Sequence, residues 1–344
     1  MRVAVLAPVA WRTPPRHYGP WERVASLLTE GLVARGVDVT LFATADSITT
    51  AELDATVPHP YAEDPSMDGR VWEALHVAHA LERSAEFDIV HNHLDWLPLA
   101  FAGAWRAPLV TTIHGFSGPG ILPAYAAASL NSASSNAASS SYVSISDADR
   151  SPLLDYVATV HHGIDLTELD FSATPGEDLV AFGRIHPDKG TADAIRIARL
   201  AGRRLIICGI VQDQEYFEEA VDPHIDGDRV RYLGSVGPSD RSAVLGSAAV
   251  LLHPIHFDEP FGLSVVEAMA TGTPVIAYAR GSMSEVVDPG VTGFLVDGVD
   301  AAVAVVDAAS ALDRREVRAV AALRFGVDRM VSEYLAVYER ILAR

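Results

Sequence analysis

Short, almost continuously apolar runs recur along the chain, and most are followed by a loop and then by an amphipathic stretch. The run at Arg2–Val9 precedes a predicted helix over residues 21–35, in which apolar side chains recur every three or four positions. The run at Leu179–Phe182 opens the second half in the same way, with a predicted helix over residues 191–201. Strands that are apolar on both faces are typical of parallel sheets covered by helices. The pattern predicts an α/β protein with two doubly wound, Rossmann-like domains.

Further strands are predicted in both halves, with helical stretches between most of them. They lie at residues 37–44, 88–91, 109–114, 142–146, 158–162, 204–209, 230–235, 249–254, 274–279 and 293–296. The polar stretch 166–179, with its Pro-Gly turn, is the best linker candidate. The Ser-, Ala- and Asn-rich stretch 132–141 is of low complexity, and we assign it no function.

This pattern indicates three parts. We expect an N-terminal domain at residues 1–168, a C-terminal domain at 169–326, and an amphipathic helix at 327–344 that packs back toward the N-terminal domain. Two such domains are expected to face a central cleft. Ligands bind at the carboxyl ends of the strands in sheets of this kind.

Composition narrows the possible partners. The formal net charge of −19 argues against nucleic acid and against broad binding to anionic membranes. No apolar run reaches transmembrane length and no signal peptide precedes the first strand, so we expect no transmembrane segment and a cytoplasmic protein. An anionic substrate would need its own cationic pocket within this acidic background.

One lysine, Lys189, stands among 25 arginines, in the loop Gly183–Gly190 that follows a predicted strand. The same loop carries Arg184. A planar guanidinium and a flexible ammonium beside glycine suit a diphosphate, because the first can bind two oxygens and the second can follow a moving charge. The alternative is a solvated loop with one accidental lysine.

The segment 253–287 contains two glutamates eight residues apart, Glu259 and Glu267. Glu259 lies in a loop after a strand, and Phe261-Gly262 would begin a helix that carries Glu267. The free N–H groups at a helix start favour an anion or a polar sugar edge. Two carboxylates could instead flank one bond, as in glycosidases, or could cap the helix and face solvent. Because both glutamates belong to a βα unit beside the Lys189 loop, we favour a separate ligand-binding role for each of them.

These motifs resemble a known enzyme family. The string EPFGLSVVEAMATGTPVIA, with GRxxxxKG about seventy residues earlier, is similar to the family 4 retaining glycosyltransferases of the GT-B fold. DIVHNH, TTIHG, HHGID and VTGFLV extend the resemblance over nearly the whole chain. Within the family, the Arg- and Ala-rich composition and the opening PPRHYGPWERV resemble actinomycete enzymes of avilamycin-type antibiotic biosynthesis.

The resemblance implies a role for each matching residue. Arg184 and Lys189 would hold the donor diphosphate, Glu267 the ribose hydroxyls, and Glu259 the hydroxyls of the donor sugar. His114 would lie beside the reacting centre, and Gly19 would let the N-terminal loop approach the phosphate. The implied catalytic set is His114, Arg184, Lys189 and Glu259. The implied donor-binding set is Gly19, Gly183, Arg184, Lys189, Glu259, Phe261, Gly262, Leu263 and Glu267.

Two positions depart from the family's pattern. The N-terminal loop usually has paired glycines, whereas Tyr18-Gly19-Pro20 supplies one, and Pro20 has no N–H to offer a phosphate. His162 stands where the family usually has asparagine, and we assign it no catalytic role.

The implied activity is transfer of a sugar, with retention, from a nucleotide-diphosphate sugar to a hydroxyl of a small-molecule or oligosaccharide acceptor. The N-terminal domain would bind the acceptor and the C-terminal domain a UDP, GDP or dTDP sugar. We expect antibiotic or glycoconjugate biosynthesis, and neither a metal nor a cofactor. A nucleotide-sugar epimerase of the same fold and a non-catalytic nucleotide-sugar binding protein remain as alternatives. The sequence leaves the oligomeric state open.

Weaker signals have simpler explanations. His91 and His93 share a strand face, but such histidines are more often polar groups at a cleft rim, or satisfied by backbone, than metal ligands. Glu22, in the first turn of a predicted helix, could touch the acceptor or could compensate the helix dipole.

Overall fold

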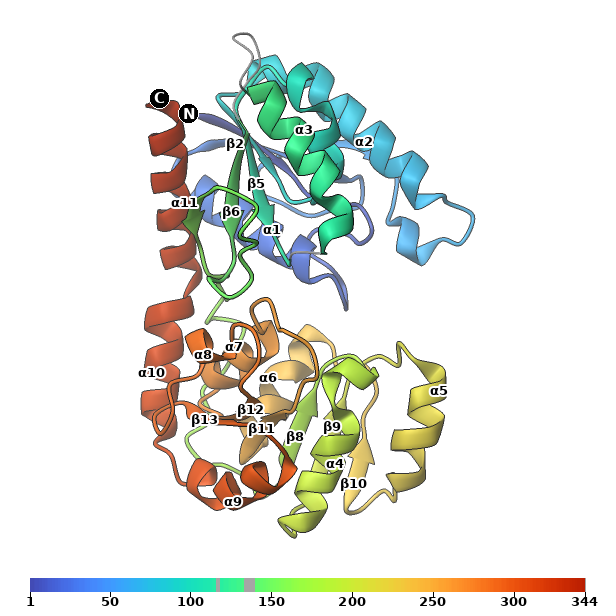
Figure 1. The fold of residues 1–344 in the computed structure, drawn as a ribbon, viewed down its shortest axis with the longest axis vertical. Coiled ribbons are helices and arrows are strands. Elements are labelled where there is room, and N and C mark those ends of the chain that lie inside the picture. The colour runs from blue at the N-terminus through green and yellow to red at the C-terminus, as the bar shows by residue number, and fades with distance from the viewer. Residues whose placement is uncertain (116–117, 133–139, 344) are drawn as a thin grey trace. The chain divides into compact units, whose positions relative to one another are not determined.

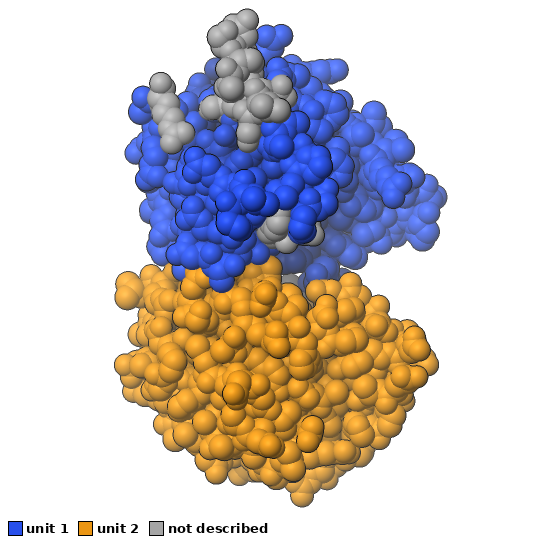
Figure 2. Space-filling view, viewed as in Figure 1, with its two compact units in different colours: residues 1–163, 327–344 blue, residues 164–326 orange. Residues whose placement is uncertain are grey.

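The computed structural model describes residues 1–115, 118–132 and 140–343 (Figure 1). Residues 133–139 of the Ser-rich stretch lie outside these ranges. The chain divides into two compact units, which Figure 2 colours separately. Unit 1 comprises residues 1–163 and 327–344, and unit 2 comprises residues 164–326. The C-terminal helix therefore belongs to unit 1.

Unit 1 is built on a parallel sheet of seven strands within its described residues. The strand order is β3-β2-β1-β4-β5-β6-β7, which is the doubly wound order with one strand added at the end. The strands are β1 (Arg2–Leu6), β2 (Asp38–Thr44), β3 (Glu52–Val57), β4 (Ile89–Asn92), β5 (Leu109–Ile113), β6 (Ser140–Ser144) and β7 (Tyr156–Thr159). The chain reverses direction across the sheet between β1 and β4, which creates a switch point where ligands bind in such folds.

The helices of unit 1 include the C-terminal one. They are α1 (Pro20–Ala34), α2 (Gly69–Arg83), α3 (Leu122–Ser132) and α11 (Val327–Leu342). The helix α11 packs closely on α1, because a Cβ added at Gly31 would lie only 2.4 Å from Cγ2 of Val331. Its buried side chains, which include Tyr334 and Tyr338, recur with helical spacing along one face.

Unit 2 repeats the arrangement with a parallel sheet of six described strands in the order β10-β9-β8-β11-β12-β13. The strands are β8 (Leu179–Phe182), β9 (Leu205–Cys208), β10 (Val230–Tyr232), β11 (Val250–His253), β12 (Val275–Tyr278) and β13 (Gly293–Val296). Its helices are α4 (Thr191–Leu200), α5 (Gln214–Tyr216), α6 (Pro238–Ser247), α7 (Leu263–Ala270), α8 (Met283–Val286), α9 (Val299–Ser310) and α10 (Arg314–Phe325). Its switch point lies between β8 and β11.

The predicted fold class is confirmed: both units are doubly wound α/β domains. The strands are short and the central ones are buried, and apolar side chains from the sheet and its helices form the core of each unit. In the described ranges, no helix combines the length and the apolar character needed to cross a membrane.

Candidate functional site

Two loops of unit 2 meet at its switch point, and they carry three of the predicted donor-site residues. The loop after β8 contains Arg184 and Lys189, and the loop after β11 contains Glu259. Gly190 allows the loops to touch: it has φ 66°, and a Cβ there would lie 1.8 Å from the carbonyl oxygen of Pro254. The two loops are thus brought into contact, the first with both predicted cations and the second with Glu259.

Lys189 and Glu259 form a direct ion pair. The Nζ of Lys189 donates to Oε2 of Glu259 at 2.7 Å, and the two side chains are only 17% and 12% exposed. The ammonium also lies 4.4 Å from the ring centroid of Phe257. Burial alone would raise the pKa of the Glu259 carboxyl, but the neighbouring His253 imidazole and the Lys189 ammonium hold it below its ordinary value, at about 2. Glu259 is therefore charged at neutral pH and suited to accept hydrogen bonds.

Arg184 lies beside the loop that follows β9. Its guanidinium donates to the side-chain oxygen of Gln212. This bond uses one of five guanidinium N–H groups, so the others remain available for an anion. Gln212 has no sequence signal of its own, because an amide beside a loop arginine belongs to no motif.

Glu267 is paired with an arginine that sequence reasoning also missed. Glu267 lies on α7 and is 7% exposed, so it is not a solvated helix residue. Its Oε1 accepts a hydrogen bond from Arg241 on α6. Arg241 also lies over the ring of Phe182, at 5.7 Å from the centroid. The Arg241 guanidinium therefore holds the Glu267 carboxylate in place through Oε1. The second oxygen, Oε2, has no bond to Arg241.

The helix α7 begins beside these pairs. Gly262 is its cap residue and Leu263 its first helical residue, so the N–H groups of the first turn lie at the start of the helix. Phe261 is buried, with its ring 5.8 Å from that of Phe325. The Phe261 ring packs within unit 2, so only its backbone is suited to contact a donor.

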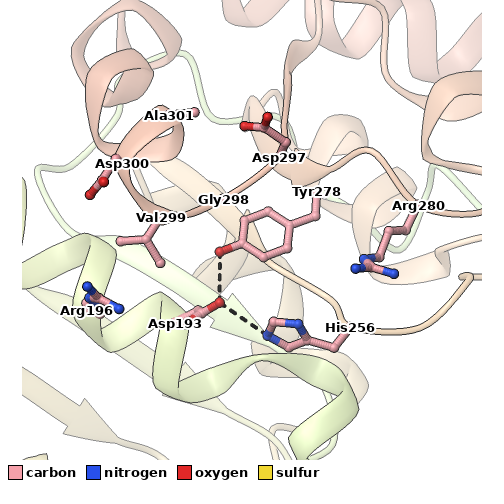
Figure 3. Close-up of a pocket in the computed structure, with 10 residues that line it drawn as sticks. All are labelled: Asp193, Arg196, His256, Tyr278, Arg280, Asp297, Gly298, Val299, Asp300 and Ala301. Atoms are coloured by element: carbon pink, nitrogen blue, oxygen red, sulfur yellow. Dashed lines mark hydrogen bonds and ion pairs between the residues drawn. The ribbon is translucent and has the colours of Figure 1, made fainter.

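A separate polar pocket of about 520 Å³ opens on unit 2 (Figure 3). Asp193 lies at its centre, where it accepts from the hydroxyl of Tyr278 at 2.8 Å and lies 3.2 Å from Nε2 of His256. Arg196 and Arg280 contribute charge to the lining. None of the predicted donor-site residues lines this pocket.

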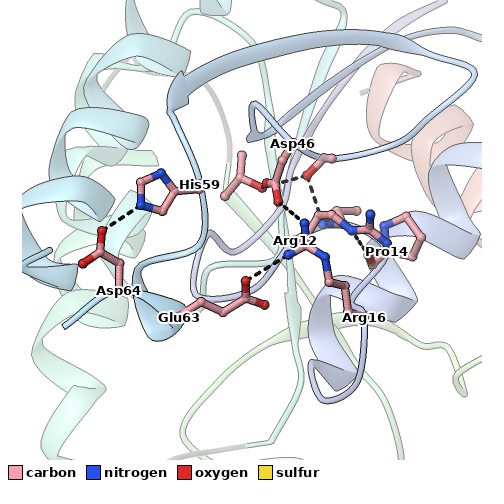
Figure 4. A network of polar contacts seen from close by, with 10 residues as sticks. Arg12, Pro14, Arg16, Asp46, His59, Glu63 and Asp64 are labelled. Carbon is pink, nitrogen blue, oxygen red and sulfur yellow. Dashed lines mark hydrogen bonds and ion pairs between the residues drawn. The ribbon is translucent and has the colours of Figure 1, made fainter. Parts of the chain in front are cut away.

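In unit 1, the loop between β1 and α1 carries Gly19 and is fixed by arginines (Figure 4). The guanidinium of Arg16 donates to Asp46 and to Glu63, both at 2.9 Å, and so ties the loop to the segments after β2 and β3. Gly19 has φ 147°, and a Cβ there would lie 2.8 Å from Cβ of Pro15. The single glycine is therefore required by the packing of the loop.

Pro20 begins α1, with Gly19 as the residue that precedes it. The first N–H groups of a helix have no partner inside the helix, so a proline there removes none of its hydrogen bonds. Pro20 also has no backbone N–H, so the loop offers one hydrogen-bond donor fewer to a phosphate. Phosphate binding by this loop stays a prediction.

Glu22, in the first turn of α1, is 3% exposed, and its Oε1 accepts from the backbone N–H of Trp11 at 3.2 Å. Burial raises the pKa of this carboxyl to about 7, against the opposing effect of its backbone hydrogen bonds. A contact between Glu22 and an acceptor was one reading of the sequence. In the structure Glu22 bonds the N-terminal loop, and contact with an acceptor stays a prediction.

The stability of unit 1 is expected to depend on pH through Glu22. Because its pKa is raised in the folded state, its favourable contribution is present below pH 4.5 and is lost as pH rises through about 7. Glu22→Gln should remove up to about 3 kcal/mol of this pH dependence. The test is denaturant unfolding at pH 5 and pH 8, followed by fluorescence because all five tryptophans lie in residues 1–163. If the free energy of unfolding falls equally in wild type and variant between pH 5 and pH 8, Glu22 is not the source of the pH dependence.

His114 follows β5 and is held by two other histidines. Its Nε2 lies 2.8 Å from Nδ1 of His93, and its Nδ1 lies 3.3 Å from Nε2 of His162. The ring of Trp21 stacks on it, with centroids 5.3 Å apart and planes 17° apart. His114 is 7% exposed. A hydrogen bond from either ring nitrogen to a sugar would have to replace one of these contacts.

His91 belongs to the same buried cluster. Its Nδ1 lies 2.6 Å from the hydroxyl of Tyr338, and its Nε2 lies 2.8 Å from the hydroxyl of Thr112, which also bonds Tyr334. Over the described ranges, no group of three or more His, Cys, Asp or Glu side chains is placed to hold a metal ion. The expectation that no metal or cofactor is needed stays a prediction.

Two family models match the chain, one for each half. Residues 21–168 match glycosyltransferase family 4, and residues 171–322 match the glycosyl transferases group 1. Among curated relatives, a glycogen synthase of Mycobacterium tuberculosis is 28% identical over 89% of this chain and 87% of its own length. A D-inositol 3-phosphate glycosyltransferase of Corynebacterium efficiens is 29% identical over 71% of this chain and 66% of its own length.

Solved structures share the fold. AviGT4, a glycosyltransferase involved in avilamycin A biosynthesis, has a TM-score of 0.74 at 24% identity and matches 100% of this chain and 98% of its own. HepE of Anabaena, solved with UDP and glucose, has a TM-score of 0.72 at 19% identity over 98% and 99% of the two chains. With its two doubly wound units and the two family models that match them, the chain belongs to the family 4 glycosyltransferases of the GT-B fold.

Proposed function

We propose that this glycosyltransferase moves a sugar, with retention of configuration, from a nucleoside-diphosphate sugar to a hydroxyl of a small-molecule or oligosaccharide acceptor. The observation that carries the proposal is the ion pair of Lys189 and Glu259 at the switch point of unit 2, with Arg184 in the same loop as Lys189. Ligands bind at this place in doubly wound sheets. Cations there suit a diphosphate, and a charged carboxylate suits sugar hydroxyls.

In this proposal Lys189 and Arg184 stabilise the negative charge that grows on the diphosphate as the sugar leaves. Glu267, which Arg241 holds in place, accepts hydrogen bonds from the ribose hydroxyls. Glu259 accepts from the hydroxyls of the sugar, a task that its low pKa supports. A carboxylate so tightly paired with Lys189 is a weak nucleophile, which favours attack by the acceptor over a covalent sugar intermediate.

The donor base and the acceptor are proposed at the level of chemical class. HepE was solved with UDP and with UDP-glucose, which supports a uridine donor ahead of the GDP and dTDP alternatives. Glycogen synthase and inositol phosphate glycosyltransferase among the relatives favour polyhydroxylated acceptors. A role in antibiotic biosynthesis rests on the likeness to AviGT4. A cytoplasmic location stays a prediction.

The test incubates the chain with UDP-, GDP- and dTDP-hexoses, first alone and then with a panel of polyols and oligosaccharides, and follows products by NMR. We expect at most slow hydrolysis without acceptor, and transfer that keeps the anomeric configuration with it. Inverted product would contradict retention. A changed sugar without acceptor would identify an epimerase, and tight binding without turnover under any condition would identify a binding protein.

A further inference from the structure

A buried histidine at the end of β11, His253, lies beside the ion pair of Lys189 and Glu259. It is 4% exposed, and its Nε2 has no hydrogen-bond partner among the described residues. This nitrogen lies 3.6 Å from Oε2 of Glu259, the same oxygen that accepts from Nζ of Lys189 at 2.7 Å. One carboxylate oxygen therefore faces two nitrogens, of which only the lysine nitrogen is at hydrogen-bonding distance.

The charge of Glu259 determines which nitrogen of His253 carries a proton. Glu259 is ionised at neutral pH because its pKa is about 2, so its oxygens present only lone pairs. An unprotonated Nε2 would place its own lone pair against this anion in a buried site, where repulsion is strong. Nδ1 has no hydrogen bond to a described residue that would favour the other tautomer. Nε2 therefore carries a proton and directs its N–H toward the carboxylate.

The backbone of Glu259 is fixed by the loop after β12. The N–H of Ser282 donates to the carbonyl oxygen of Glu259 at 2.9 Å. A Cβ added at Gly281 would lie only 2.4 Å from the backbone nitrogen and from the carbonyl oxygen of Glu259. Lys189, in contrast, carries its ammonium on a flexible four-carbon stem. An ammonium that turns toward a diphosphate therefore leaves the Glu259 carboxylate behind, facing His253.

We propose that His253 is a positioning residue that directs its Nε2–H at Oε2 of Glu259 and becomes the remaining partner of this carboxylate when Lys189 binds the donor diphosphate. A buried carboxylate that loses its cation is costly, and His253 is the neighbour that limits this cost. Glu259 then stays ionised and oriented while it accepts hydrogen bonds from the donor sugar. The movement of Lys189 rests on the proposed function, in which the ammonium binds the diphosphate.

The first test follows His253 by 15N NMR of the full chain with labelled histidine, with its signals assigned from a His253→Gln variant. In the wild type at neutral pH we expect a protonated Nε2. Lys189→Met imitates the departure of the ammonium. The pKa of His253 should then rise by about one unit or more, because the opposing cation is gone and the favouring carboxylate remains. Lys189→Met combined with Glu259→Gln should reverse this rise.

His256 supplies the matched control on the same loop. Its side chain is 46% exposed, and its Nε2 faces Asp193 at 3.2 Å (Figure 3). Lys189→Met should shift the titration of the His256 signals far less than that of His253. An unprotonated Nε2 of His253 in the wild type, or an unchanged His253 titration in Lys189→Met, would overturn the proposal. If Lys189→Met does not fold, the wild-type spectrum and the kinetics of His253 variants decide.

Kinetics with the donor identified by the screen test the consequence for the reaction. His253→Leu is similar in volume and has no donor, and we expect kcat/KM to fall roughly 10- to 100-fold, the loss of one hydrogen bond to a charged group. His253→Gln can donate from near the position of Nε2 and should recover most of kcat/KM. His256→Gln should leave kcat/KM unchanged.

The outcomes separate this proposal from the proposed function. A raised pKa of His253 in Lys189→Met, in a chain with no transferase activity, would contradict the proposed function alone. If Lys189→Met raises this pKa and the bound donor does not, the contact of Lys189 with the diphosphate is contradicted. Wild-type kcat/KM in His253→Leu would overturn the positioning role of His253.

Discussion

Lys189→Ala is expected to lower kcat by about 10²–10³-fold, the loss seen when one group that stabilises developing charge is removed. Lys189 is the only lysine in the sequence, and its ammonium pairs with Glu259 at the switch point of unit 2. Arg184 would still bind the diphosphate, so the KM for donor should rise less than kcat falls. Steady-state kinetics with the donor identified by the NMR screen measure both effects.

The structure adds a stability cost that the sequence did not suggest. Lys189 pairs with the buried Glu259 and lies over the ring of Phe257. Lys189→Ala therefore leaves a buried carboxylate without its cation, and the free energy of unfolding of unit 2 should fall by roughly 3 kcal/mol.

A double variant separates the two effects. Lys189→Met with Glu259→Gln removes both charges and should recover most of the lost stability, as measured by thermal unfolding. It should not recover activity, because the cation that holds the phosphate is still absent. Wild-type kcat in Lys189→Ala, or recovered activity in the double variant, would contradict the assignment of Lys189.

Glu267→Gln is expected to weaken nucleoside-diphosphate binding by about 1.5–3 kcal/mol, or roughly 10- to 100-fold in Kd. The carboxylate is buried and held by Arg241, so it is already oriented for the ribose hydroxyls. The amide keeps the size of the side chain but loses the charge that strengthens those hydrogen bonds. Calorimetric titration of wild type and variant with UDP measures the difference.

Two further ligands make this result specific to the ribose. Pyrophosphate has no ribose, so wild type and Glu267→Gln should bind it with similar affinity. Glu267→Gln should weaken the binding of the 2′-deoxyribose analogue of UDP less than it weakens the binding of UDP. Arg241→Met removes the partner that orients the Glu267 carboxylate, and it should also weaken the binding of UDP. Equal weakening for UDP and pyrophosphate would show that Glu267 acts through the fold and not through the ribose.

The sequence predicted those parts of the fold that bury continuous apolar runs. Strands such as β8 and β13 were predicted at their observed bounds, and the C-terminal helix was predicted over the residues of α11. The edge strand β3 was not predicted, because its residues ELDATV alternate between polar and apolar and form no continuous apolar run, and only Val57 is buried. The first strand ends at Leu6 rather than Val9, because pairing with β2 and β4 stops there although the apolar run continues.

For the site, the sequence identified residues that belong to motifs and missed those that matter through their partners. Lys189 and Glu259 stand seventy residues apart, and their contact follows from two loops meeting at one switch point. Arg241 reaches Glu267 from another helix, and His162 reaches His114 from the end of unit 1's sheet. Such pairings depend on how elements pack, which no local pattern contains.

The most direct test of the account is a crystal structure of the wild-type chain with the nucleoside diphosphate that raises its melting temperature most among UDP, GDP, dTDP, CDP and ADP. We expect the diphosphate oxygens within hydrogen-bonding distance of Lys189 and Arg184, and the ribose hydroxyls within hydrogen-bonding distance of Glu267. A nucleotide bound instead in the polar pocket around Asp193, or away from Lys189 altogether, would contradict it.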